Sequence, residues 1–543
     1  MSVTFPDQFN LADYYLFDRL NEGFEDKPAI LFGDRSWSYQ DVANRTNHLQ
    51  AWMRDFGLAK EQRVLIILPD TPAFAWSIFA TLAHGAVVTM GNPDAATDDL
   101  AYVLQYTRAT VLITIPRVAE ALQQQTQESD CVKALLLVPE VKTFDDPESA
   151  LTISETLKQL SKAIFSLSDI VNKPDVATKI NSNSKRDDIA FWLFTSGSTG
   201  RPKAALHSHR DFAFNTEMYA KATVGYQKDD ITVSIPRLYF GYATGTNLLF
   251  PFSVGATSGL FSEHPSPESL TRYVKHYRAT IVTNVPTMLG KILEYDGDLD
   301  LTSVRFHLSA GEALPPTLMK RFTERFGQDV YDGIGSAEMF HIYCSNRPGD
   351  IKPGSLGKVV KGYEIRILAD DAEGPGATQL AAGETGVMWV KGDSVAHGYF
   401  QDRDKSWQTF HGHWCCTGDL FRLDAEGYLY FSGRSDDIFK VSGIWLAPNE
   451  VEECLMQHPA VALCCVIPVQ IDGLTKSKAL IVLRETLKDS PKGQDLTTEL
   501  QQHVKERLNR YKYPRYIDFV DDLPRNDRGK INRKLLIAEA AKG

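Results

Sequence analysis

The chain has 543 residues, 43% of them hydrophobic and 23% charged, so it is an ordinary globular sequence long enough for at least two domains. Its formal net charge of −11 argues against a nucleic-acid partner and against an anionic membrane surface. No apolar run is long enough to predict a membrane span, and the first residues lack a secretory signal pattern.

Seven cysteines are present, and none of them has the C-x-x-C spacing of a zinc site. An odd number in a long chain is typical of a reduced protein with small buried thiols. The last residues, Ala540–Gly543, do not form a peroxisomal address. We therefore expect a cytoplasmic protein.

Short apolar runs alternate with amphipathic runs between Lys27 and Ile115. This alternation predicts right-handed βαβ units and parallel sheets. The later stretch Asn172–Arg186 is polar, and we expect an exposed connection there. The strands expected in the alternating part are Arg63–Pro69, Ala86–Met90 and Val111–Ile115, and the helices are Thr71–His84 and Asp98–Thr107.

A loop of hydroxyl and glycine residues follows the apolar run Ala190–Phe194, which is typical of a buried strand. Glycines let backbone N–H groups approach an anion, hydroxyls add donors, and Lys203 adds a positive charge. The loop predicts a phosphate site, although Arg201 and Pro202 exclude a Walker A motif. The alternative is a plain surface turn. The expected phosphate contacts are Thr195, Ser196, Gly197, Ser198, Thr199, Gly200 and Lys203.

Strand–helix alternation resumes from about Phe191 to Leu308, and a glycine-rich, β-branched region follows at Gly354–Gly398. The strands expected in that β-rich region are Glu364–Leu368 and Gly386–Val390. A new unit begins near Asp436, and its pattern predicts a small α+β module. Its expected elements are helix Pro448–Gln457, strands Val461–Val469 and Ala479–Arg484, and helix Leu496–Tyr511.

The predicted fold class is therefore α/β. We expect a large N-terminal domain, residues 1–435, that combines strand–helix units and parallel sheets with a β-rich subdomain. We expect residues 436–543 to form a small, mobile α+β domain.

Four further motifs follow the phosphate loop in a fixed order. Together with Thr195–Lys203 they resemble the motifs of the adenylate-forming superfamily, which includes acyl- and aryl-CoA synthetases, peptide-synthetase adenylation domains and firefly luciferase. Chance agreement of five ordered motifs over residues 195–530 is very unlikely. The four motifs are Tyr331–Glu338, Thr417–Asp419, Gly433–Asp437 and Pro524–Lys530.

The resemblance implies a two-step reaction on a carboxylic acid. ATP adenylates the acid and releases pyrophosphate, and the thiol of coenzyme A then displaces AMP. Because the attacking carboxylate and the phosphate are both anions, such a site must supply positive charge, a metal and alignment. By the same resemblance, the loop Thr195–Lys203 holds the leaving phosphates and Glu338 binds Mg²⁺, which prefers one or two carboxylates with phosphates and waters.

The resemblance also implies the contacts to adenine. Asp332 is expected to accept a hydrogen bond from the adenine amino group, and Ser336 stands where other members often have Thr. The segment Ser309–Pro315 is expected to flank the ring through the backbone of Gly311 and Glu312. The expected ATP contacts outside the phosphate loop are Gly311, Glu312, Asp332, Gly333, Ser336, Asp419 and Arg434.

Three of the later motifs imply separate roles. Asp419 resembles the aspartate that accepts from both ribose hydroxyls. Arg434 matches a second nucleotide contact, for which a structural salt bridge is the alternative. Lys530 lies in a segment rich in Pro, Asn, Asp and Gly and resembles the catalytic lysine that reaches the α-phosphate and the carboxylate during adenylation. An inert loop lysine is the alternative.

Asp436 resembles the hinge between the two domains. In the family the small domain rotates after adenylation, so that Lys530 leaves the site and the loop containing Lys440 and Gly443 faces the adenylate. A glycine at that position would let a pantetheine arm pass close to the backbone.

His207 and His209 form an H-x-H pattern that can ligate zinc, but no further Cys or His cluster accompanies them. The family has similar histidines after the phosphate loop, and we expect them to orient the loop and the helix that follows.

The segment Pro236–Gly245 resembles the substrate-side loop of benzoate–CoA ligases, which reads Lys-Leu-Phe-Phe-Ala-Tyr-Gly in that region. The segment Ser336–Asn346 resembles the same ligases. The aromatic side chains of Tyr239, Phe240 and Tyr242 are expected to form the wall of a flat, narrow pocket, with plain core packing as the alternative. The expected substrate contacts are Arg237, Tyr239, Phe240, Gly241, Tyr242, Gly335, His341 and Ile342.

Two departures from those ligases concern the acid. Gly241 stands where they often have Ala, which leaves room for a small ring substituent, and Arg237 replaces Lys and is expected to face the carboxylate. No Asp lies between Pro236 and Thr246 to hold an α-amino group, so an α-amino acid is disfavoured, and so is a long fatty acid. With His341 as a polar neighbour, 2-aminobenzoate (anthranilate) is the predicted acid.

Three alternatives stay open at the level of sequence. The acyl acceptor can be the phosphopantetheine of a carrier protein instead of CoA. A non-catalytic sensor or scaffold on the same fold is a second alternative, against which Lys530, Glu338 and Asp419 argue. A luciferase-like oxygenase is the third, and nothing in the chain specifically indicates it.

Overall fold

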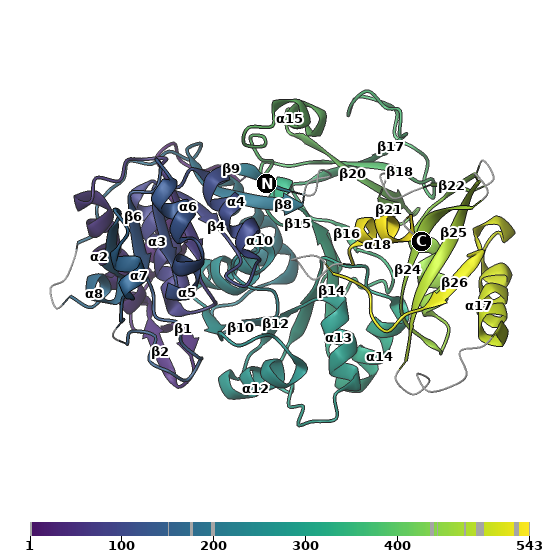
Figure 1. The fold of residues 1–543 in the computed structure, drawn as a ribbon, viewed down its shortest axis with the longest axis horizontal. Coiled ribbons are helices and arrows are strands. Elements are labelled where there is room, and N and C mark those ends of the chain that lie inside the picture. Colours follow the sequence, from purple (N-terminus) through teal and green to yellow (C-terminus); the bar gives the residue numbers. More distant parts are fainter. Residues whose placement is uncertain are drawn as a thin grey trace. The chain divides into compact units, whose positions relative to one another are not determined.

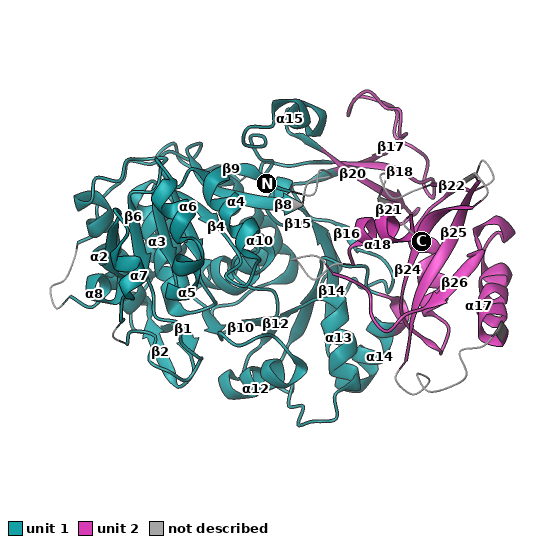
Figure 2. Ribbon diagram, viewed as in Figure 1, with its two compact units in different colours: residues 1–314, 318–364, 390–415 teal, residues 315–317, 365–389, 416–543 magenta. Residues whose placement is uncertain are grey.

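The computed structural model divides into two compact units, coloured separately in Figure 2. The first contains residues 1–314, 318–364 and 390–415, and the second contains residues 315–317, 365–389 and 416–543. Within the described part of the chain, no helix has the length and apolar character needed to cross a membrane. The structure describes residues 3–149, 151–173, 178–196, 201–434, 439–441, 444–471, 474–484, 494–525 and 531–541.

A seven-stranded sheet in the first unit has the strand order β7–β6–β5–β3–β4–β8–β9, and Figure 1 labels its strands β4, β6, β8 and β9. Its neighbouring strands are parallel except for β8 and β9, which form an antiparallel hairpin. Strands β4, β5 and β6 are buried at every residue, as expected for a parallel sheet covered on both faces. The strands are β3 (Arg63–Ile67), β4 (Val87–Met90), β5 (Val111–Thr114), β6 (Ala134–Leu137), β7 (Ala163–Ser166), β8 (Ile189–Ser196) and β9 (Pro202–Ser208).

The helices of this part begin and end at local signals. Helix α2 (Tyr39–Asp55) begins with a capping box, in which Ser38 and Asp41 each accept from the other's backbone N–H. Helix α3 (Pro72–His84) ends at Gly85, whose φ of +82° suits a residue without a side chain. The remaining helices are α4 (Thr97–Thr107), α5 (Pro116–Ala121), α6 (Gln123–Glu128), α7 (Glu155–Lys158) and α8 (Leu167–Val171).

A nine-stranded sheet in the first unit has the order β16–β15–β14–β13–β12–β10–β11–β1–β2. The strands from β14 to β1 are parallel to their neighbours, while β2, β15 and β16 run antiparallel at the two edges. Because parallel strands end at the same edge of a sheet, the loops that follow them gather there. The strands are β1 (Pro28–Phe32), β2 (Arg35–Ser38), β10 (Ile231–Ser234), β11 (Thr257–Leu260), β12 (Ile281–Asn284), β13 (Phe306–Ser309), β14 (Asp329–Gly335), β15 (Ile342–Ser345) and β16 (Lys358–Val359).

The apolar faces of α12, α13 and α14 bury a core against this sheet, with Val274, Leu289, Phe322 and Val330 among its members. Three of the elements here, η1, η2 and η3, are π-helical, and η4 is a 3-10 helix. The helices are η1 (Asp13–Phe17), α1 (Asp18–Asn21), α9 (His209–Asn215), η2 (Thr216–Val224), α10 (Gly241–Thr244), η3 (Gly245–Leu249), α11 (Phe250–Ser253), α12 (Pro267–Tyr277), α13 (Pro286–Glu294), α14 (Pro316–Phe326) and η4 (Ala337–Met339).

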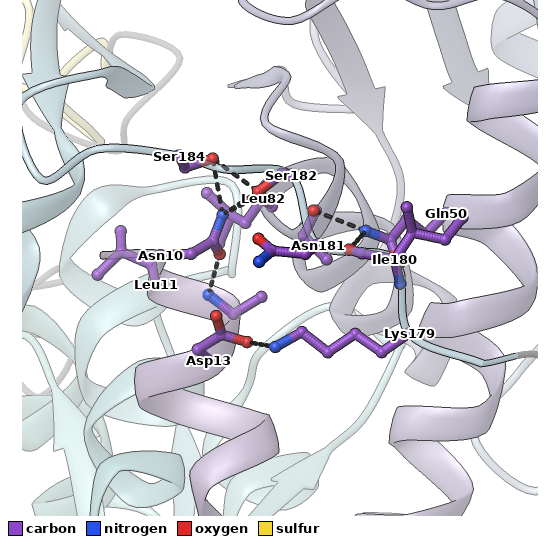
Figure 3. A network of polar contacts seen from close by, with 12 residues as sticks. Asn10, Leu11, Asp13, Gln50, Leu82, Lys179, Ile180, Asn181, Ser182 and Ser184 are labelled. Carbon is purple, nitrogen blue, oxygen red and sulfur yellow. Dashed lines mark hydrogen bonds and ion pairs between the residues drawn. The ribbon is translucent and has the colours of Figure 1, made fainter. Parts of the chain in front are cut away.

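The sequence predicted that the polar connection before β8 is exposed, but part of it is buried. Ser184 is 4% exposed, and the Asn10 amide donates to its hydroxyl over 3.1 Å and to the Leu82 carbonyl over 2.7 Å (Figure 3). Gln50 exchanges two hydrogen bonds with the backbone of Ile180, over 2.7 and 3.0 Å. The N-terminal segment and α2 therefore fix this connection, because side chains far away in sequence satisfy its polar groups.

A five-stranded sheet has the order β17–β18–β20–β19, with β21 beside β20. Strand β20 pairs antiparallel with both β19 and β21. The sequence predicted β17 at its observed bounds and ended β18 one residue early. The elements are β17 (Glu364–Leu368), β18 (Gly386–Lys391), α15 (Arg403–Thr409), β19 (Phe410–His411), β20 (Trp414–Leu423) and β21 (Leu429–Arg434).

The end of the chain forms a three-stranded sheet in which β24 and β25 are antiparallel and β25 and β26 are parallel. Residues of α16, α17 and the sheet share one apolar core, which includes Val451, Leu455, Ile481 and Leu500. The elements are β22 (Phe439–Val441), β23 (Ile444–Leu446), α16 (Pro448–Met456), β24 (Val461–Ile471), β25 (Leu474–Leu483), α17 (Gln494–Arg507), η6 (Arg510–Lys512), β26 (Tyr516–Phe519) and α18 (Arg533–Ala540).

The observed sheets confirm the α/β class, the parallel strands and the small α+β module at the end of the chain. The compact units group residues 365–389 and 416–434 with that module, whereas the sequence placed them in an N-terminal domain ending at residue 435. The boundary at 435/436 and the mobility of the small domain therefore stay predictions about which parts move together.

Five of the seven cysteines are buried, in line with small thiols that fill apolar space. Neighbouring Cys464 and Cys465 pack into different apolar clusters, because successive side chains of β24 point to opposite faces.

Candidate functional site

The predicted phosphate loop lies at the tip of the β8–β9 hairpin. The last paired residues of the hairpin are Thr195 with Lys203 and Ser196 with Pro202. The tip residues Gly197, Ser198, Thr199 and Gly200 lie outside the described residues. The structure thus places Thr195 and Lys203 opposite each other at the base of the loop, and the phosphate contacts of the tip stay a prediction.

Lys203 lies against two groups that are distant in sequence. Its ammonium nitrogen is 3.6 Å from the centre of the Tyr399 ring, and the Tyr399 hydroxyl donates to Glu338 Oε1 over 2.6 Å. Burial lowers the pKa of Lys203, and the negative charge of Glu338 opposes this shift. The predicted phosphate lysine and the predicted metal carboxylate thus lie on either side of one phenol, which the sequence analysis did not single out.

The turn that carries Glu338 is held by backbone contacts. The backbone carbonyl of Glu338 accepts from the Ala396 N–H over 2.8 Å. The carbonyl of the preceding Ala337 accepts from His207 Nε2 over 2.6 Å. His207 Nδ1 lies 3.1 Å from Asp211 Oδ2 on helix α9. His207 therefore links the hairpin, the helix that follows it and the Glu338 turn, in line with the orienting role expected for it.

His209 points elsewhere. Its Nδ1 accepts from the Leu11 N–H over 3.2 Å, and burial lowers its pKa to about 4, so the ring is neutral near pH 7. The histidine pair therefore separates, with one ring at the Glu338 turn and the other at the N-terminal segment.

The carboxylate of Glu338 has the chemistry of a ligand for a divalent metal ion such as Mg²⁺. Glu338 is half-buried, and apart from Tyr399 no described residue binds its side-chain oxygens. The described residues contain no group of three or more His, Cys, Asp or Glu side chains that would cage a metal. One open carboxylate suits Mg²⁺ that keeps phosphates and waters as its other ligands.

Asp332 lies on β14, opposite Ser309 of β13. It is 4% exposed, and burial raises its pKa to about 8 while the Ser309 hydroxyl partly opposes the shift. At neutral pH the carboxyl is therefore mainly protonated in the free protein. It retains a carbonyl oxygen that can accept from an adenine amino group.

The loop after β13 contains the two residues predicted to flank adenine through their backbone. Gly311 has a φ of +91°, a conformation that favours glycine. The Glu312 carboxylate accepts from the N–H and the hydroxyl of Thr287, over 3.1 and 2.7 Å. Its side chain is thus occupied at the start of α13, which is consistent with a backbone rather than a side-chain contact.

The acid-side segment, Pro236–Gly245, is anchored at its start by Asp70. Asp70 Oδ1 accepts from the Leu238 N–H over 3.0 Å, and its Oδ2 lies 3.8 Å from Arg237 Nη1. Arg237 also donates to the Phe261 carbonyl over 2.7 Å and lies over the Phe261 ring. The described contacts of Arg237 therefore fix the loop, and its predicted contact with the substrate carboxylate stays a prediction.

The aromatic residues of the acid-side segment separate into two groups. The rings of Tyr239 and Phe240 lie 4.6 Å apart, and the ring of Tyr242 lies 5.3 Å from His341. A methyl group at Gly241 would lie 3.2 Å from Leu193 Cδ1 and 3.7 Å from the Phe340 carbonyl oxygen. The room that the sequence predicted beside Gly241 is therefore already filled by Leu193 and by the backbone of Phe340.

His341 is 3% exposed and lies among the rings of Tyr219, Tyr242 and Phe250. Burial lowers its pKa to about 3, so the ring is neutral. Its Nε2 donates to the Tyr242 carbonyl over 3.0 Å, which makes Nδ1 the unprotonated nitrogen. Nδ1 is buried and has no hydrogen-bond partner in the part of the chain that the structure describes.

Glycines bring the strands around His341 close together. A side chain at Gly335 would lie 2.4 Å from the His341 carbonyl oxygen, and one at Gly245 would lie 2.6 Å from the His341 ring. Glycine is therefore required at both positions. Gly333 is similarly constrained by the Cys344 carbonyl at 2.8 Å, and Ile342 pairs with Gly335 across the β14–β15 ladder. The hydroxyl of Ser336 is buried without a described partner.

The second unit carries the remaining predicted residues. The backbones of Asp419 and Arg434 are opposite each other in the β20–β21 ladder. The Asp419 N–H donates to the Thr417 hydroxyl over 3.2 Å. Lys440 lies on β22 opposite Trp445. Three predicted positions lie outside the described residues: Asp436, Gly443 and Lys530.

The two ends of segment 526–530, which contains Lys530, are described and closely held. Arg525 bridges to Ile531, and the Asn532 N–H donates to the Pro524 carbonyl over 2.7 Å. Arg533 then forms a two-pronged ion pair with Glu452 of α16, at 2.7 and 3.2 Å, in largely buried surroundings. The chain thus enters and leaves the predicted lysine loop at one fixed place.

Comparison with known proteins identifies the family. The sequence pattern of the AMP-binding enzymes matches residues 17–400, and that of the AMP-binding enzyme C-terminal domain matches residues 450–530. A benzoate–CoA ligase of Thauera aromatica is 34% identical over 98% of this chain and 96% of its own length. An anthranilate–CoA ligase of Pseudomonas aeruginosa is 31% identical over 87% and 86%.

The fold agrees with these relatives. The crystal structure of the anthranilate CoA ligase AuaEII in complex with anthranoyl-AMP superposes with a TM-score of 0.88 and 32% identity, over 99% of this chain and 98% of that one. With two family patterns in order and relatives similar over nearly their whole length, the chain belongs to the AMP-binding enzyme family.

Proposed function

We propose that the chain is an ATP-dependent, AMP-forming aryl-CoA ligase whose acid is a benzoate with a hydrogen-bond donor on the ring, with 2-aminobenzoate as the first candidate. The observation that carries the choice of acid is the buried Nδ1 of His341, which has no hydrogen-bond partner among the described residues and whose ring lies beside that of Tyr242. Similarity to benzoate– and anthranilate–CoA ligases over most of the chain supports the reaction.

A lone pair without a partner inside a protein costs about 1–3 kcal/mol. An amino or hydroxyl group on the ring of the acid would donate to His341 Nδ1 and remove that cost, whereas unsubstituted benzoate would not. The Tyr242 hydroxyl, also buried without a described partner, is a second polar atom of the same region. These two atoms favour a polar substituent over a purely apolar one.

In the proposed first step, a carboxylate oxygen attacks the α-phosphorus of ATP, a new P–O bond forms, and the bond to the β-phosphate bridging oxygen breaks to release pyrophosphate. The loop Thr195–Lys203 would hold the β- and γ-phosphates, and Lys530 would reach the α-phosphate and the carboxylate. Mg²⁺ would supply charge neutralisation beside Glu338.

The remaining residues would hold the nucleotide. Asp419 would accept from both ribose hydroxyls, Asp332 from the adenine amino group, and Arg434 would make a further contact. In the second step the sulfur of CoA attacks the acyl carbon, the bond from that carbon to the AMP oxygen breaks, and the thiol proton passes to solvent. Lys440 and Gly443 are the proposed thioester-side residues, and Asp436 is the proposed hinge.

The test is acid-dependent exchange of pyrophosphate with ATP over benzoate, 2-amino-, 2-hydroxy- and 4-hydroxybenzoate and an aliphatic acid, followed by addition of CoA. The proposal expects the highest kcat/KM with a 2-substituted benzoate and CoA-dependent release of AMP. A preference for the aliphatic acid would contradict the aryl assignment. Exchange without CoA transfer would instead indicate a pantetheinylated carrier protein as acceptor.

A further inference from the structure

We propose that Tyr399 is a positioning residue of the adenylation site: its hydroxyl orients the carboxylate of Glu338 toward the metal, and its ring holds the ammonium group of Lys203 beside that carboxylate. The inference rests on the proposed function, in which Glu338 binds Mg²⁺ and Lys203 binds phosphate. It adds a residue 61 positions after Glu338 that none of the five sequence motifs contains.

The geometry gives Tyr399 two partners at once. The hydroxyl donates to Glu338 Oε1 over 2.6 Å, and the Lys203 nitrogen lies 3.6 Å from the ring centre, within the range of a cation–π contact. One side chain thereby contacts the carboxylate of Glu338 on η4 and the ammonium group of Lys203 on β9.

Tyr399 is well fixed. It is 7% exposed, its backbone bridges to Ala205 of β9, its N–H donates to the Ser406 hydroxyl over 2.9 Å, and its ring packs 5.1 Å from that of Phe410. Because the phenol cannot easily move, its hydrogen bond sets the direction of the Glu338 carboxylate.

Among the described residues, only Tyr399 binds the side chain of Glu338. Its second oxygen has no hydrogen-bond or ion-pair partner among the described residues, and the side chain is only half-buried. A carboxylate with one oxygen fixed by a donor and the other free is arranged as a metal ligand with an outer partner. Loss of such an outer partner typically weakens metal affinity 10- to 100-fold.

The test compares Tyr399→Phe with a matched control. The variant keeps the ring over Lys203 and removes only the hydroxyl. The control is Tyr106→Phe, which also removes one tyrosine hydroxyl. The Tyr106 hydroxyl donates to the carbonyl of Phe400, the residue after Tyr399, over 2.7 Å and does not contact Glu338. Affinity for Mn²⁺ is measured by water-proton relaxation with α,β-methylene ATP present, alongside the Mg²⁺ dependence of pyrophosphate exchange.

We expect Tyr399→Phe to weaken Mn²⁺ affinity about tenfold and to raise the Mg²⁺ midpoint of exchange equally, with the KM of the aryl acid unchanged and Tyr106→Phe like wild type. Unchanged Mn²⁺ affinity in Tyr399→Phe would overturn the inference, even if activity fell. Tighter Mn²⁺ binding would also overturn it, because the phenol would then compete with the metal. Absence of exchange by the wild-type protein would count against the proposed function, while the binding measurement would still judge Tyr399.

Discussion

At the scale of single residues, His341 connects burial with the choice of acid. Its Nε2 is used by the Tyr242 carbonyl, and its Nδ1 is left as a buried acceptor. We predict that His341→Phe lowers the ratio of kcat/KM for 2-aminobenzoate to that for benzoate about tenfold, the effect of losing one buried hydrogen bond. Steady-state assays of the two acids measure this ratio.

His341→Gln serves as the companion variant, because an amide retains one donor and one acceptor. It should keep part of the preference that His341→Phe loses. An unchanged ratio in His341→Phe would show that the ring substituent is recognised elsewhere.

Asp70 is the residue whose ionisation the acid-side loop depends on. Burial raises its pKa to about 6, and the guanidinium of Arg237 opposes the rise. Since the carboxyl is ionised only above that pH, its ion pair with Arg237 is present at pH 7 and is lost as the pH falls through about 6. The anchor of the loop should weaken in the same direction.

We predict that Asp70→Asn raises the KM of the aryl acid about fivefold at pH 7.5, equivalent to about 1 kcal/mol, with the KM of ATP unchanged. The amide oxygen can still accept from the Leu238 N–H, while a neutral NH₂ group replaces the charged oxygen that faces Arg237. Because wild type loses the charge on acidification, the ratio of the two KM values should approach one near pH 5. A ratio independent of pH would contradict a role for Asp70 ionisation.

At the scale of elements, the ion pair between Glu452 of α16 and Arg533 fixes the base of the segment that contains Lys530. Glu452 also accepts from the Val466 N–H over 2.6 Å, so it links Arg533, which follows the segment 526–530, to β24 as well as to α16. A buried, two-pronged pair is sensitive to loss of one charge, because the guanidinium is then left without its partner.

We predict that Glu452→Gln slows adenylation about tenfold while leaving thioester formation from synthetic 2-aminobenzoyl-AMP and CoA close to wild type. The control is Glu450→Gln, which alters another ion pair of the same helix, with Lys512. The two half-reactions are measured separately by stopped-time assays. Equal losses in both would indicate general damage to the small module instead of a misplaced loop.

Elements were predictable where periodicity is local. The strands near Arg63, Val111 and Glu364 and the helix beginning at Pro448 agree with the structure to within about two residues, because apolar spacing directly reports a strand or a buried helix face. The short β7 and its flanking helices α7 and α8 were missed, because elements of four or five residues are too short for apolar spacing to separate a strand from a helix.

Side-chain partners were not predictable in the same way. Tyr399 meets Glu338, Leu11 meets His209 and Leu238 meets Asp70 across 61, 198 and 168 positions of sequence. Nothing in the local pattern of either partner signals such a pairing. The pairing of Arg237 with Asp70 was not predictable for the same reason, because Asp70 follows a strand of the other sheet.

At the scale of the whole molecule, the mechanism requires two sets of residues at different times. The proposed adenylation set includes Lys530, and the proposed thioester set includes Lys440 and Gly443, and all three belong to the second unit. If one module serves both steps in turn, a change in one set should affect only its own step. This separation is the strongest test of the predicted two-domain reaction cycle.

We predict that Lys530→Ala reduces aryl-acid-dependent pyrophosphate exchange about 10²- to 10³-fold, as for removal of one group that stabilises developing charge, and leaves CoA transfer from synthetic 2-aminobenzoyl-AMP nearly unchanged. Lys534→Ala, which removes a lysine from α18, is the matched control and should retain both steps. If Lys530→Ala lost both steps equally, the lysine would not act in adenylation alone. If it retained exchange, the family assignment of the lysine would fail, and positive charge at the α-phosphate would have to come from the first unit, where Lys203 is already engaged with Tyr399.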